Sequence, residues 1–79
     1  MKIDIKEIYS DGNAKLDDIE EYITKIKTLV KTGEDVVITG AGPIWLYLKI
    51  AHALHGLATS LTYNSPVTGD VVIFNHNPF

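Results

Sequence analysis

The chain has 79 residues, no cysteine and a formal net charge of −3, and 46% of its residues are hydrophobic. This length and composition predict one globular domain over residues 1–79, either by itself or as a piece of a longer effector. The lack of cysteine excludes disulfides and thiolate metal sites. No apolar run approaches the roughly 20 residues that cross a bilayer, so we expect a cytoplasmic protein without a membrane segment.

The charged residues are concentrated at one end of the chain. Nine of the ten acids and six of the seven lysines precede residue 36, and the remainder carries only Lys49 and Asp70 as charged residues, with all three histidines. This nearly uncharged part is too large for one small core, so we expect it to form an interface in a homodimer. The chain has no arginine, which argues against binding to duplex nucleic acid.

The first part of the chain predicts a strand followed by a helix. Alternating isoleucines indicate a strand over Lys2–Ile8, and Ser10–Asn13 has the composition of a turn. Apolar residues at helical spacing then predict a helix with Asn13 as its N-cap and Gly33 as its stop. The core-facing stripe of this helix consists of Leu16, Ile19, Ile23, Ile26 and Val30.

A second strand and helix follow. The β-branched run Asp35–Thr39 predicts a central parallel strand that is covered on both faces. An apolar helix is expected over Ile44–Leu54, with Pro43 at its first position and Gly56 just past its end.

Two further strands are predicted over Leu57–Tyr63 and Asp70–His76, with a turn between them. The order β-α-β-α-β-β corresponds to a minimal Rossmann-like α/β domain that ends in a hairpin.

A glycine-containing turn joins the central strand to the second helix. It consists of Thr39, Gly40, Ala41, Gly42 and Pro43. Backbone N–H groups and the helix dipole attract anions at such a place, and glycine lets a phosphate approach the backbone. The motif lacks the third glycine of a dinucleotide fingerprint and the Lys-Ser/Thr of a P-loop. The alternative is that the glycines only make a tight turn.

The three histidines are a second candidate feature. His52 and His55 share one helix face, and His76 follows the last strand. With Asp70 as the nearest acid, they have ligand types that bind a divalent metal. The alternatives are a helix-end cap for His55, an interface residue for His52 and a surface residue for His76.

Aromatic and amide side chains are a third feature. Trp45, Tyr47 and Tyr63 are residue types that stack on bases, although core or interface packing explains them equally well. Asn64 and Asn75 end two strands, where α/β proteins usually bind ligands, and both also suit turns.

These motifs together resemble a known family. The segments VVITGAGPIWLYLKIAHALHG, LTYN and GDVVIFNH, between Val36 and His76, are similar to the small CRISPR-associated ring nucleases of type III systems that act on cyclic tetra-adenylate. The resemblance covers about half the chain. It implies a small Rossmann-like sensor fold, a homodimer, and two dimers that sandwich the ring-shaped ligand.

The resemblance also implies roles for single residues. His52, His55 and His76 match the family's histidines, two of which are associated there with manganese and one with the active centre. The family's aspartate after the aromatic residue is Asn64 here, and its arginine between the glycines is Ala41. The implied ligand-binding residues are Thr39, Gly40, Ala41, Gly42, Pro43, Ile44, Trp45, His52, His55, Tyr63, Asn64 and His76.

These departures bear on catalysis. The family's second arginine falls in the region 65–67, which has no basic residue. An amide cannot act as a general base, and no fixed positive charge meets the developing negative charge of a phosphoryl reaction. We therefore expect a sensor that binds cyclic tetra-adenylate without a cofactor and does not cleave it. Membrane-anchored CRISPR effectors carry similar cytosolic sensor domains.

Two alternatives stay open. One is a manganese-dependent ring nuclease in which His52, His55 and His76 are the catalytic candidates and Asp70 replaces the absent carboxylate. The other is a protein-interaction module whose apolar half docks a partner.

Overall fold

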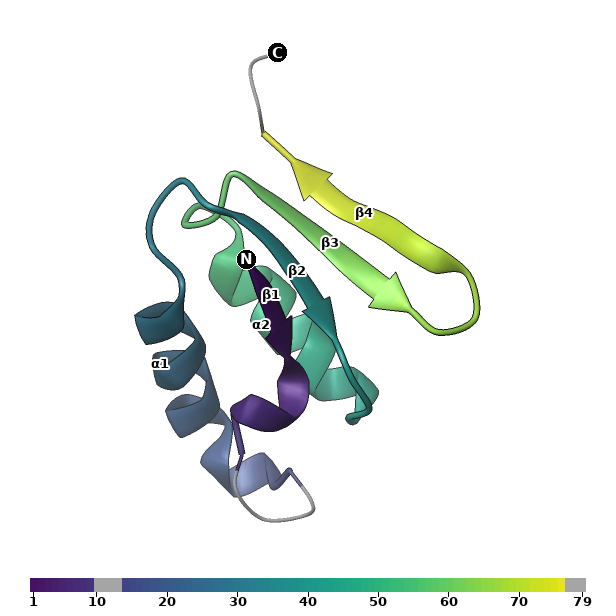
Figure 1. Ribbon diagram of the computed structural model, residues 1–79. Helices are drawn as coiled ribbons and strands as arrows, with labels where there is room; N and C mark the ends of the chain where they lie inside the picture. Colours follow the sequence, from purple (N-terminus) through teal and green to yellow (C-terminus); the bar gives the residue numbers. More distant parts are fainter. Residues whose placement is uncertain (10–13, 77–79) are drawn as a thin grey trace.

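The computed structural model describes residues 1–9 and 14–76, and in them a four-stranded sheet has the strand order β1-β2-β3-β4. The strands are β1 (Lys2–Asp4), β2 (Asp35–Thr39), β3 (Ser60–Ser65) and β4 (Gly69–Asn75), and the helices are α1 (Ile19–Leu29) and α2 (Ile44–Leu54). The first three strands are parallel and β4 is antiparallel to β3. This order confirms the expected minimal Rossmann-like α/β architecture (Figure 1).

Both helices cover the same face of the sheet. Helix α1 packs against α2, and the side chains that the strands direct toward them are buried, among them Val36, Ile38 and Leu61. The alternate residues Val37 and Thr39 are only partly buried. The expectation that β2 is covered on both faces is therefore wrong for this chain alone.

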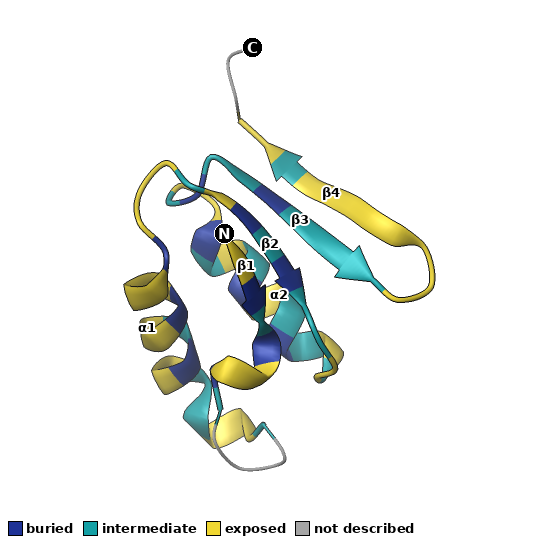
Figure 2. Cartoon of the chain, viewed as in Figure 1, coloured by how far each residue is buried: buried dark blue, intermediate teal, exposed yellow. Residues whose placement is uncertain are grey.

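The edge strand β4 is exposed along most of its length (Figure 2). Neither helix reaches over it, because α1 connects β1 to β2 and α2 connects β2 to β3. Phe74 is its only partly buried residue. A bulge at Leu61/Thr62 shifts the register, so that Leu61 pairs with Phe74 and Thr62 with Val72.

The amino-terminal strand is shorter than predicted. It ends at Asp4, whose carboxylate accepts a hydrogen bond from the Lys6 N–H at 2.9 Å. This bond caps a short 3₁₀-helix, Ile5–Glu7, because an aspartate side chain can compete with strand pairing for backbone donors. The turn buries Ile5 and Ile8, so both isoleucines reach the core without a strand.

The stripe predicted for the first helix is partly wrong. A second 3₁₀-helix, Leu16–Asp18, precedes α1, and Leu16 is 64% exposed. Tyr22 is buried in its place, and its hydroxyl accepts a hydrogen bond from the Lys15 N–H at 2.8 Å. Ile26 and Val30 are buried as expected. The proposed N-cap Asn13 and the turn Ser10–Asn13 lie outside the described residues.

Helix α2 closely follows its prediction. It starts at Ile44, with Pro43 as the N-cap instead of the first helical residue, and Gly56 follows its C-cap with a positive φ of 95°. The next strand starts three residues later than predicted, at Ser60. Instead of strand pairing, the Leu57 carbonyl accepts from the Gly33 N–H at 2.9 Å and the Thr59 N–H donates to Glu34 O at 2.8 Å.

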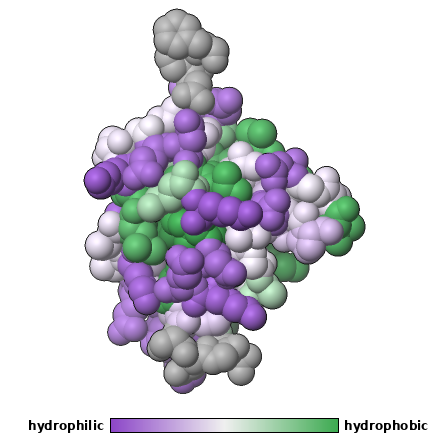
Figure 3. All heavy atoms as spheres, viewed as in Figure 1, coloured by the Kyte–Doolittle hydropathy of each residue, from purple (hydrophilic) through white to green (hydrophobic). Residues whose placement is uncertain are grey.

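Apolar side chains remain exposed on the surface of the chain. On the face shown in Figure 3, hydrophobic side chains lie between hydrophilic ones. In the described part of the chain, no helix is both long and apolar enough to cross a membrane.

Leu46 provides a test of the core. It is 0% exposed, so Leu46→Ala leaves a cavity and should lower the free energy of unfolding by about 2 to 5 kcal/mol. The matched control Leu16→Ala removes the same atoms from a side chain that is 64% exposed, and should cost less than about 0.5 kcal/mol. Denaturant unfolding of both variants measures the difference. Equal losses would contradict the burial pattern.

Candidate functional site

The glycine turn lies at the edge of the sheet where the parallel strands end. Thr39 is the last residue of β2, and Gly40, Ala41, Gly42 and Pro43 lead directly into α2. Asn64, near the end of β3, is the neighbour of Thr39 across the strands, because the Thr39 hydroxyl bonds the Asn64 side chain. The sequence-predicted residues of this region therefore do lie together.

Two tyrosines hold the carbonyl groups of the turn. The Tyr47 hydroxyl donates a hydrogen bond to Gly40 O, and the Tyr9 hydroxyl donates to Ala41 O at 3.1 Å. In a trans peptide the carbonyl and the following N–H point in opposite directions, and the described residues contain no cis bond. The Ala41 N–H therefore points away from Tyr47, and the Gly42 N–H points away from Tyr9.

Neither of these two N–H groups has an acceptor within residues 1–9 and 14–76. They precede the amino end of α2, where the helix dipole adds partial positive charge. Such a pair of outward N–H groups suits an anion that approaches from solvent.

The glycines of the turn are also packed closely against neighbouring residues. Gly40 has a φ of +104°, and a Cβ there would come within 2.3 Å of Asp4 Oδ1. A Cβ on Gly42 would meet Ile5 Cγ2 at 3.3 Å. Gly40 is thus required by backbone conformation and by its neighbour, so the tight-turn interpretation holds for it alongside any role in binding.

A chain of polar side chains crosses three strands on the uncovered face. The Thr39 hydroxyl donates to Asn64 Oδ1 at 3.0 Å, and Asn64 Nδ2 donates to Asp70 Oδ1 at 2.8 Å. Asn64 and Asp70 are register partners in the β3–β4 hairpin. The lone acid of the second half thus joins the carboxyl edge of the sheet. Asn75, in contrast, pairs with Ser60 at the opposite edge, so the expected placement of both asparagines at one ligand edge is wrong.

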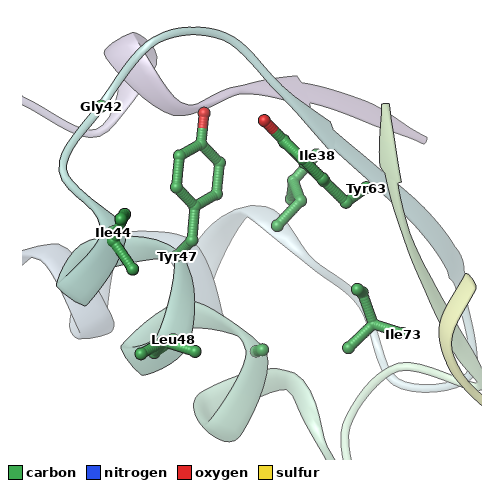
Figure 4. Close-up of a pocket in the computed structure, with 8 residues that line it drawn as sticks. Ile38, Gly42, Ile44, Tyr47, Leu48, Tyr63 and Ile73 are labelled. Atoms are coloured by element: carbon green, nitrogen blue, oxygen red, sulfur yellow. The ribbon is translucent and has the colours of Figure 1, made fainter. Parts of the chain in front are cut away.

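An apolar groove of about 330 Å³ opens on the helix side of this edge (Figure 4). Tyr47 and Tyr63 stand side by side in it, with ring centroids 5.2 Å apart, and their hydroxyls point toward the turn. The groove is lined by Ile38, Gly42, Ile44, Tyr47, Leu48, Ala51, Tyr63 and Ile73. Trp45 is not among them and packs against the core instead.

Sequence reasoning missed Leu48 and Ile73, although the spacing contained a signal for the groove. Leu46, Ile50 and Leu54 form the buried stripe of α2, while Ile44 and Leu48 form a second apolar stripe that is 78% and 67% exposed. A helix that is apolar on more than one side needs cover beyond its own sheet. Tyr9 was also missed, because no periodicity relates it to the turn.

The histidines form a separate group. Nε2 of His55 and Nε2 of His76 are 3.0 Å apart, and both rings make edge or tilted contacts with Phe74. His52 is exposed on α2 and joins neither contact. In the described part of the chain, no three histidine, aspartate or glutamate side chains gather in a way that could hold a metal.

The histidine pair and the glycine turn lie at opposite edges of the sheet. Helix α2 starts at the turn and ends beside His55, and its 11 residues span roughly 16 Å. His76 N–H donates to Thr59 O at 2.8 Å, next to the start of β3. One copy of the chain therefore cannot bring the turn and the histidines into a single small pocket.

Gly40 can be tested against Gly56, since both have positive φ but only Gly40 has a crowded neighbour. Gly56 has no atom within 4 Å of an added Cβ. Each alanine substitution should cost about 1 to 3 kcal/mol from backbone strain, and Gly40→Ala should cost more because Asp4 must give up its bond to Lys6. Unfolding free energies of the two variants measure this difference, and equal values would contradict it.

Tyr47 should make stability depend on pH in the alkaline range. Burial, followed by the neighbouring Tyr63, raises the pKa of Tyr47 from 10.0 to about 12. Its contribution to stability is complete below pH 10 and is lost as the pH rises through about 12, since the unfolded chain releases the proton first. Tyr47→Phe should flatten this part of the stability curve. An unchanged slope would show that Tyr47 ionises normally.

Comparison with known proteins identifies the family. No solved structure gives a significant match to the chain. The family described as CRISPR-associated protein (Cas_csx3) matches residues 11–79, a range that includes both helices, β2 to β4, the glycine turn and the histidines. This match confirms the CRISPR association that the motifs indicated, and the chain belongs to the Cas_csx3 family of CRISPR-associated proteins.

Proposed function

We propose that this chain is a sensor that binds cyclic tetra-adenylate in type III CRISPR antiviral defence, in the cytoplasm, and does not cleave it. The observation that carries the proposal is the pair of outward N–H groups of Ala41 and Gly42 beside the polar chain of Thr39, Asn64 and Asp70. Membership of a CRISPR-associated family and the resemblance of the motifs to proteins that act on this ring support the choice of ligand.

Each part of the edge suits one part of a nucleotide. A phosphodiester accepts hydrogen bonds from the N–H groups at the start of α2, where no lysine or arginine is needed to attract it. The polar chain across the strands offers hydrogen bonds to a base or a ribose. On the helix side of the edge, Ile44 and Tyr63 line the apolar groove beside the turn.

The turn and the end of β3 lack the positive charge that cleavage needs. In-line attack by a ribose hydroxyl requires a base that takes the proton and a positive charge that stabilises the phosphoryl oxygens. Asn64 is a neutral amide, and its side chain is already bonded to Thr39 and Asp70. The turn and the end of β3, residues 39–45 and 63–65, contain no lysine, arginine or histidine. Binding is therefore better supported than turnover.

The proposal includes an assembly of two homodimers around the ring. The turn and the histidine pair lie at opposite edges of one chain, so both can reach one ligand only if different copies contribute them. A ring held between the turn edge of one dimer and the histidine edge of another meets this requirement. The exposed apolar residues Ile44, Leu48 and Ile73 favour association, because isolated monomers rarely leave such side chains together in water.

The alternative of a manganese nuclease has one observation in its favour, the approach of His55 Nε2 to His76 Nε2 at 3.0 Å. Manganese prefers oxygen ligands together with imidazole, and the described residues supply no acid to this pair. His52 does not contact the pair either. The described residues of one chain therefore do not fit the ion.

Calorimetry with cyclic tetra-adenylate and with its linear tetranucleotide tests the proposal, together with light scattering before and after addition. We expect tight binding of the ring, a dimer without ligand, and two dimers per ring at saturation. The linear form should bind more weakly, because it loses conformational freedom that the ring has already given up. Asn64→Ala should weaken ring binding by about 1 to 3 kcal/mol, the cost of leaving its partners unsatisfied.

Incubation of the same protein with the ring and manganese, followed by chromatography, separates the alternatives. The ring should stay intact. Rapid opening that His55→Ala or His76→Ala abolishes would replace the sensor by a nuclease. No binding of either nucleotide would leave the protein-interaction module as the better description.

A further inference from the structure

Asn64 and Asp70 form a hydrogen-bonded pair of polar side chains at the ligand edge. Asp70 is the only acid after residue 35, and within the described residues its carboxylate has one hydrogen bond, from Asn64 Nδ2 at 2.8 Å. Both side chains lie on the face of the sheet that the helices leave open, opposite each other in the hairpin. No core packing explains the acid, because Asp70 is exposed.

The neighbours of Asn64 fix the direction of its amide. An ionised carboxylate can only accept, so the amide nitrogen has to face Asp70. The amide oxygen then faces the Thr39 hydroxyl, which donates to it at 3.0 Å. The amide nitrogen carries two hydrogens and uses one of them on Asp70, and the carboxylate has a second oxygen. The pair therefore presents one donor next to one acceptor.

A donor beside an acceptor is the complement of an adenine edge, which presents an amino donor beside a ring nitrogen acceptor. We propose that Asn64 and Asp70 together read the adenine base of the ligand: the Asp70 carboxylate accepts from the adenine amino group and the Asn64 amide donates to a ring nitrogen. This inference rests on the proposed function, and it assigns Asp70 to specificity instead of catalysis.

The placement of Asp70 favours the base over the ribose. The N–H groups suited to phosphate follow β2, and Asp70 lies on β4, two strand spacings or roughly 10 Å across the sheet. In a nucleotide the base edge lies farther from the phosphate than the 2′-hydroxyl does. The same separation keeps the negative carboxylate away from the phosphate, whose charge it would otherwise repel.

The test compares two rings, cyclic tetra-adenylate and the same ring built from purine riboside, which lacks the amino group. Wild-type protein should bind the adenylate ring about tenfold more tightly, since a good base contact gives 1 to 3 kcal/mol of discrimination. Asp70→Asn keeps the size of the side chain and an acceptor for Asn64. It should weaken binding of the adenylate ring about tenfold and leave the purine ring unchanged.

Glu21→Gln is the matched control, because it also turns an exposed acid into an amide, on a helix outside the β3–β4 hairpin. It should change neither affinity. Equal weakening of both rings by Asp70→Asn, or no weakening of either, overturns the assignment while the sensor function stands. Wild-type protein that binds neither ring overturns the sensor function and the assignment with it.

Discussion

The handedness of the two crossovers governs the arrangement of this molecule. Parallel strands joined in the order β1, β2, β3 by right-handed connections carry both helices on one face of the sheet. The other face carries Val37 and several polar side chains, among them Thr39, Thr62 and Asn64. Because α2 connects β2 to β3 and is the last helix in the described residues, no helix among them covers β4. The chain thus has an open sheet face and an exposed edge strand. A ligand or second copy meets polar groups on the open face and apolar groups beside the edge strand.

Helix α2 links the two candidate regions and also separates them. The helix begins just after the glycine turn and ends just before His55. A ligand group bound at the turn is therefore about one helix length away from the histidine pair. The tyrosine hydroxyls fix the carbonyls of the turn on the helix side, which leaves its N–H groups directed elsewhere. The geometry of the turn therefore depends on Tyr9, which follows β1 in the chain, and on Tyr47 of α2. It exists only in the folded domain.

The sequence predicted the elements whose signals are local. The β-branched run of β2, the turn at Gly40 and Gly42 and the stop at Gly56 each depend on the conformational preference of a few residues, and all lie where expected. The prediction for Lys2–Ile8 was wrong because the Asp4 side chain captures a backbone N–H, which alternation of apolar residues cannot indicate. Leu16 was misplaced because Tyr22 fills the core with a hydroxyl that has a backbone partner.

The candidate site was harder to predict than the fold, because contacts across strands decide it. The proximity of Asn64 and Asp70 follows from hairpin register, which the bulge at Leu61/Thr62 alters, and no spacing rule supplies it. The separation of the histidines from the turn could have been predicted from the sequence, because the two ends of an 11-residue helix are far apart. What remains at the turn edge is a set of backbone N–H donors, with the Asp4 carboxylate beside the turn on β1 and the Asp70 carboxylate two strands away on β4. Such an edge attracts an anion through the fixed partial charges of its N–H groups, which supports the proposed recognition of a nucleotide.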